Sequence, residues 1–154
     1  MTIIATAGTS HIALRVTDVD RAVAWYGEVL GYEVLWNGLA PTPDKTRSAM
    51  GLIADGALAL EFLETPGGKP WTVESLGVAG ISLTVPDIDA AVAAFNASAH
   101  GQKTQVFDAE DWRVAFLFDP DRNVVELVQQ PAGVASIAAF APTLRQRRDA
   151  AARA

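Results

Sequence analysis

The chain has 154 residues, half of them hydrophobic, and carries a formal net charge of −6 at pH 7. It contains no cysteine, which excludes disulfides, thiolate metal sites and cysteine nucleophiles. The acidic balance argues against a nucleic-acid partner, because phosphate binding needs a basic surface, and no apolar run approaches the roughly 20 residues of a membrane helix. The start of the chain, MTIIATAG, lacks the charge and length of a secretory signal, so we expect a cytoplasmic protein without a membrane partner.

A first βαβββ module is predicted over residues 8–65. Apolar and other residues alternate along IALRV at 12–16, which is the period of a strand with two distinct faces. Asp18 or Asp20 then caps a helix, and Gly31 can end that helix in the left-handed conformation that glycine tolerates. Three further strands are expected at residues 33–36, 47–54 and 57–64, the last two joined by a turn at ADGA.

The second half of the chain repeats this order. Ile81 takes the place of Ile12, and the acidic DVD of the first copy returns as DID between strand and helix. Equivalent elements are expected as a strand at 78–85, a helix at 88–99 closed by Gly101, and strands at 102–107, 112–118 and 124–128. The sequence therefore predicts one α+β domain over residues 1–131, with modules at 8–65 and 78–130, a linker at 66–77 and a helical tail at 132–154.

Each module carries a glutamate inside its last strand, Glu61 in ALALEFLE and Glu126 in NVVELVQ. Strands disfavour glutamate, and burial of an unpaired carboxylate is costly, so two such residues at corresponding places favour a shared function. His11 opens the first strand on the same face as Arg15, and Gly80 takes its position in the second copy. Alone, His11 could equally be a structural residue that is bonded to the backbone.

These features together resemble the vicinal oxygen chelate superfamily, which includes glyoxalase I, extradiol dioxygenases, methylmalonyl-CoA epimerase and the bleomycin- and fosfomycin-resistance proteins. The resemblance rests on the duplicated βαβββ unit, on HIALRV and LEF at the two ends of the first copy, and on DPDRNVVEL at the end of the second. It implies two sheets that curl into a cup around one site, and a homodimer. It covers about residues 10–129.

In metal-using members, ligands come from the first and last strands of each module, and these positions are here His11, Glu61, Gly80 and Glu126. The resemblance therefore implies a divalent ion held by the three of these positions that have a donor side chain, which are His11, Glu61 and Glu126. The ion would be Fe, Mn, Ni, Co or Zn. One imidazole and two carboxylates suit these ions. Glycine supplies no donor, and we expect its small size to leave space beside the ligands. The glutamates are also the candidate catalytic bases.

The implied function is a metal-dependent lyase, isomerase or dioxygenase that chelates neighbouring oxygens of a small, oxygen-rich metabolite. Two alternatives without metal stay open: a binding protein that sequesters a drug or antibiotic, and a cyclase or isomerase that uses the glutamates for proton transfer. Candidate substrate-binding residues are Arg15, Gly80, Trp71 and Trp112. A cation suits an anionic substrate, and an aromatic ring suits a flat one.

Overall fold

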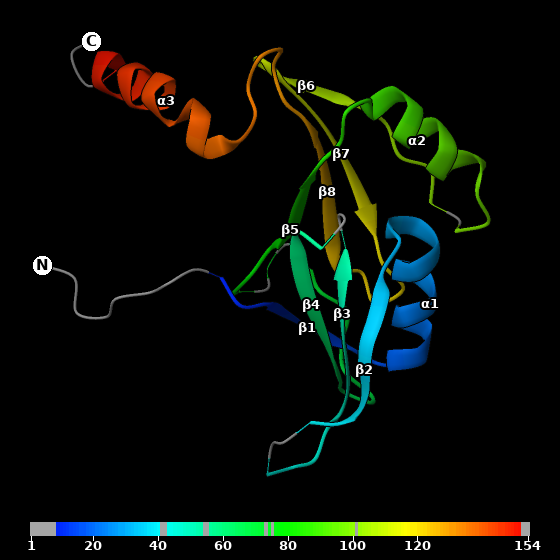
Figure 1. Ribbon diagram of the computed structural model, residues 1–154. Helices are drawn as coiled ribbons and strands as arrows, with labels where there is room; N and C mark the ends of the chain where they lie inside the picture. The colour runs from blue at the N-terminus through cyan, green and yellow to red at the C-terminus, as the bar shows by residue number, and fades with distance from the viewer. Residues whose placement is uncertain are drawn as a thin grey trace, which may run out of the picture. The chain divides into compact units, whose positions relative to one another are not determined.

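The computed structural model describes residues 9–40, 43–53, 56–72, 74, 76–100 and 102–151 (Figure 1). The chain divides into two units, one formed by residues 1–80 and 118–124 and the other by residues 81–117 and 125–154. Two four-stranded sheets and few helices confirm the predicted α+β fold of tandem βαβββ modules. Among the described residues, no helix is long and apolar enough to cross a membrane.

The first sheet has the strand order β1-β4-β3-β2. Its strands are β1 (Ile12–Val16), β2 (Glu33–Leu39), β3 (Arg47–Ile53) and β4 (Leu58–Glu64), and the helix α1 (Val19–Leu30) follows β1. β1 runs parallel to β4, whereas β3 is antiparallel to both β4 and β2. The helix packs on β3 and β4, where Tyr26 stacks at a tilt against Phe62 and both side chains are fully buried. This face of the sheet is the core of the first module.

The second sheet repeats the same order, β5-β8-β7-β6. Its strands are β5 (Gly80–Thr84), β6 (Phe107–Ala109), β7 (Trp112–Phe118) and β8 (Val124–Gln129), and the helix α2 (Ile88–Ala97) follows β5. The helix buries Ile88, Val92 and Phe95, three residues at helical spacing. The helix α3 (Ile137–Ala151) occupies most of the predicted helical tail.

The acidic pair that marks each module has a structural use. The first aspartate, Asp18 or Asp87, caps its helix by accepting a hydrogen bond from a backbone N–H at 3.0 Å. The second aspartate, Asp20 or Asp89, forms a bidentate ion pair with an arginine on a strand of the same module. The guanidinium of this arginine lowers the pKa of the aspartate. The arginine partners are Arg47 for Asp20 and Arg113 for Asp89.

The second module departs from prediction after its helix. The strand expected at 102–107 is wrong in its placement, since the strand observed there is β6 at Phe107–Ala109, paired with β7. The backbone N–H and C=O of Thr104 bond instead to the side chain of Asn96. The helix also ends earlier than expected, with Ser98 as its C-cap. Gly101, predicted to close it, lies outside the described residues.

Candidate functional site

The pairing of β1 with β4 brings His11 next to Glu61. Ala13 lies opposite Glu61 in the register, so His11, two residues earlier on the same side of the strand, is a diagonal neighbour of the glutamate. The imidazole Nε2 lies 3.4 Å from Glu61 Oε2, and the two side chains are 35% and 15% exposed. One nitrogen donor and one carboxylate oxygen thus lie close together and in partial contact with solvent.

Neighbouring groups fix the orientation of both side chains. Ser48, which is fully buried on β3, donates a hydrogen bond of 2.8 Å to Glu61 Oε1 and leaves the other oxygen facing the imidazole. A hydrogen bond of 3.2 Å joins Ser10 Oγ to His11 Nδ1, so the second ring nitrogen is the one turned to Glu61. Burial, together with the charge of Glu61, raises the pKa of Tyr32 above its usual value.

Glu126 belongs to the second unit and has its own surroundings there. It lines a pocket of about 200 Å³ with Trp112, the predicted aromatic residue. Ser82 on β5 donates a short hydrogen bond to its Oε2. The Oε1 of Gln130, also in this pocket, is buried and has no hydrogen-bond partner among the described residues. Glu126 therefore lies at the wall of a small pocket whose surface is mainly apolar.

The predicted metal ligands fall into two sets. His11 and Glu61 lie together in one unit, and Glu126 lies in the other. Among the described residues, no group of three or more His, Cys, Asp or Glu side chains is placed to hold a metal ion. The ligand assignment therefore stays a prediction.

Gly80 is closely packed by the backbone of β8. A Cβ atom at this position would lie 2.5 Å from the carbonyl oxygen of Val124 and 2.8 Å from its Cβ. Real Cβ atoms essentially never approach other heavy atoms this closely. The expectation that glycine leaves space beside the ligands is wrong, because Val124 already fills the place of a side chain.

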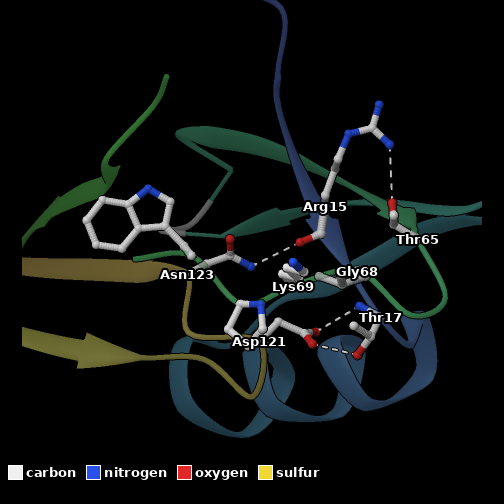
Figure 2. Close-up of a pocket in the computed structure, with 10 residues that line it drawn as sticks. Arg15, Thr17, Thr65, Gly68, Lys69, Asp121 and Asn123 are labelled. Atoms are coloured by element: carbon white, nitrogen blue, oxygen red, sulfur yellow. Dashed lines mark hydrogen bonds between the residues drawn. The ribbon is translucent and has the colours of Figure 1, made fainter. Parts of the chain in front are cut away.

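Arg15 and Trp71, predicted from separate parts of the sequence, line one pocket of about 350 Å³ in the first unit. Lys69 lines the same pocket, as does Asp121 in the turn between β7 and β8 (Figure 2). Arg15 donates a hydrogen bond of 3.2 Å to Thr65 Oγ1. This pocket joins two of the four candidate substrate-binding residues.

Sequence reasoning missed how the turn after β7 is built. Asp119 accepts hydrogen bonds from the backbone N–H groups of Asp121 and Asn123 and from the hydroxyl of Tyr26, and burial raises its pKa. Asp121 in turn binds Thr17. The pattern DPDRN is typical of a turn, and its two aspartates are the signal in the sequence that side-chain bonds hold this turn.

Comparison of the chain with known protein families identifies the family to which this fold belongs. The family model of the Glyoxalase/Bleomycin resistance protein/Dioxygenase superfamily matches residues 8–127. The chain belongs to this superfamily. The glyoxalase superfamily match spans both sheets and both glutamates, and it ends two residues before β8 does.

Individual known proteins resemble the chain over most of its length. The uncharacterized protein YaeR of Escherichia coli (strain K12) is 28% identical over 123 residues, which cover 78% of this chain and 94% of YaeR. A glyoxylase/bleomycin resistance protein/dioxygenase domain from Frankia sp. EAN1pec has a TM-score of 0.65 at 22% identity, covering 82% of this chain and 99% of that domain.

A second similar solved structure carries a metal. It is a variant of the fosfomycin resistance protein FosX from Listeria monocytogenes, complexed with Mn(II) and 1S,2S-dihydroxypropylphosphonic acid. Its TM-score is 0.62 at 20% identity, and the match covers 85% of this chain and 96% of FosX. At these identities the likeness to both solved structures establishes the fold.

Proposed function

We propose that the chain is a metal-dependent enzyme that acts on a small, oxygen-rich metabolite, with His11, Glu61 and Glu126 as ligands of one divalent ion. The observation that carries the proposal is the separation of 3.4 Å between His11 Nε2 and Glu61 Oε2. Two ligands of one transition-metal ion, each bound at about 2.1 Å, lie about 3 Å apart when they are adjacent. The pair therefore fits an ion with little movement.

The donor set also fits in its chemistry. One imidazole and two carboxylates balance a divalent charge and suit Fe(II), Mn(II), Ni(II), Co(II) or Zn(II). When bound, such an ion would act as a Lewis acid toward two neighbouring oxygens of the substrate. Buried Ser48 holds one oxygen of Glu61, which leaves the other free to bind or to accept a proton.

Glu126 is the second candidate base. Its pocket of about 200 Å³ also contains Trp112 and Ser82, so a small ligand at this wall would contact both a carboxylate and a ring. Ser82 holds one carboxylate oxygen of Glu126, so the other oxygen is the one proposed to accept a proton from the substrate. The reaction classes that we propose are lyase, isomerase and dioxygenase. A homodimer is part of the proposal.

FosX supports the proposal as a related fold that is described with Mn(II) and a small dihydroxy compound. The decisive experiment is metal analysis of the purified chain, before and after reconstitution with Fe(II), Mn(II), Ni(II) and Zn(II), beside the Glu126→Gln variant. One ion per chain, lost or weakened in the variant, is the expected result. Failure to bind any of the four ions would overturn the proposal.

A second candidate function needs no metal, and two observations favour it. Gly80 has no room for a side chain, so the fourth ligand position is closed by the backbone. Glu126 is already held by Ser82 in a pocket that suits a small ligand. The chain would then bind a drug-like compound, or transfer protons through its carboxylates. Turnover or saturable binding by protein that holds no metal after reconstitution would establish this second function.

A further inference from the structure

The pocket of about 350 Å³ in the first unit is formed by three segments of the chain (Figure 2). They are the end of β1 at residues 15–17, the stretch after β4 at residues 65–71, and the turn at residues 121–123. Asn123 fixes the third segment to the first, because its amide donates a hydrogen bond of 3.2 Å to the carbonyl oxygen of Arg15. The pocket is therefore a defined feature of this unit.

Both carboxylate oxygens of Asp121, which lines this pocket, already accept hydrogen bonds from neighbouring residues. Asp121 Oδ2 accepts a hydrogen bond of 3.0 Å from the backbone N–H of Thr17, and Oδ1 accepts bonds of 2.5 Å from the Thr17 hydroxyl and 2.8 Å from Arg21. Asp121 is buried, and the guanidinium of Arg21 balances its charge. Its negative charge is thus compensated before any ligand arrives.

The two cations that line the pocket are not compensated in this way. Figure 2 shows the Arg15 side chain directed to the neutral hydroxyl of Thr65 and away from Asp121. Within the described part of the chain, no acidic side chain pairs with Arg15 or with the ammonium group of Lys69. The pocket therefore has a surplus of positive charge, although the chain as a whole carries −6.

The remaining wall is largely apolar and contains one unpaired donor. Val16, Pro70 and Trp71 supply the apolar surface. The indole nitrogen of Trp71 is buried and has no hydrogen-bond partner among the described residues. Buried tryptophan N–H groups usually have a hydrogen-bond partner, because an unpaired buried donor is unfavourable.

We propose that this pocket is a binding site for a small organic carboxylate with a flat, apolar body. Arg15 and Lys69 attract the carboxylate, and Trp71 and Pro70 contact the body. The volume lies at the lower end of the range for ligand pockets, which limits the ligand to a small one. The site is separate from the His11–Glu61 pair, which does not line it, and the proposal does not depend on a bound metal.

Benzoate is a suitable probe, and calorimetry in the presence of EDTA is a suitable readout, because chelation removes any metal that could hold the carboxylate. We expect saturable binding of benzoate at pH 7 that weakens as salt is added. Benzamide, which has the same ring without the charge, should bind about tenfold more weakly. Inorganic phosphate, which has charge without an apolar body, should also bind more weakly than benzoate.

Matched variants locate the binding. Arg15→Gln and Lys69→Gln should each weaken benzoate binding about fivefold, whereas Arg145→Gln, which removes an exposed charge from α3, should leave it unchanged. Circular dichroism confirms that each variant is folded. The proposal is overturned if benzoate does not bind saturably, if benzamide or phosphate binds as tightly, or if both pocket variants bind benzoate like the wild type.

Discussion

Replacement of Gly80 by alanine should destabilise the protein, which is the reverse of the usual effect. An added Cβ would lie 2.5 Å from the carbonyl oxygen of Val124 and 3.1 Å from its carbonyl carbon. These atoms belong to the backbone of β8, so they cannot move aside as a flexible side chain can. Insertion of one carbon into so tight a space costs about 1–3 kcal/mol, which corresponds to a fall of about 3–10 °C in Tm.

Thermal unfolding followed by circular dichroism measures this effect, with Gly27→Ala as the matched control. Gly27 lies within α1, and a Cβ there would meet its nearest atom at an ordinary 3.8 Å. Alanine in a helix interior is more stable than glycine by about 0.5–1 kcal/mol, so the control should raise Tm. If Gly80→Ala melts at or above the wild-type temperature, the close contact with Val124 does not explain the glycine.

Three further predictions concern buried polar groups. Asp121→Asn removes the charge that Arg21 neutralises, and should lower the free energy of unfolding by about 2 kcal/mol in urea denaturation. Burial raises the pKa of Asp119 above 3.8, so the native state binds its proton more tightly than the unfolded chain does. The contribution of Asp119 to stability is therefore greatest below pH 3.8 and falls as the pH rises through its pKa in the folded state. The Asp119→Asn variant should flatten that part of the curve of stability against pH. Ser48→Ala frees one oxygen of Glu61, and should weaken the proposed metal binding about tenfold in titrations while the wild-type fold is kept; unchanged affinity would show that Ser48 does not position Glu61.

Most of the fold could be predicted from the sequence, because it follows from local patterns. Strand alternation at 12–16 and the cap at Asp18 each depend on neighbours only a few residues away. The prediction failed at Thr104, whose backbone bonds go to the side chain of Asn96 on the preceding helix. No alternation of apolar and polar residues in the sequence indicates whether a backbone group bonds to a side chain or to a neighbouring strand.

The candidate site was less predictable, because its supporting contacts are long-range. The repeat marked Glu61 as unusual, and the register of β1 with β4 places His11 beside it. Nothing in the spacing indicated that Ser48, on a different strand, holds the glutamate. Likewise, the absence of a side chain at Gly80 was visible, but its cause, the carbonyl group of Val124, is 44 residues away in the chain.

The central claim, that His11, Glu61 and Glu126 bind one divalent ion, is tested most directly by titration of Mn(II) into metal-free protein. Calorimetry would compare the wild type with His11→Ala, Glu61→Gln and Glu126→Gln. We predict one ion per chain, and a loss of affinity in each variant that exceeds the roughly 10- to 100-fold effect of removing a supporting residue. Absence of saturable binding, or binding that all three variants retain, would contradict the claim.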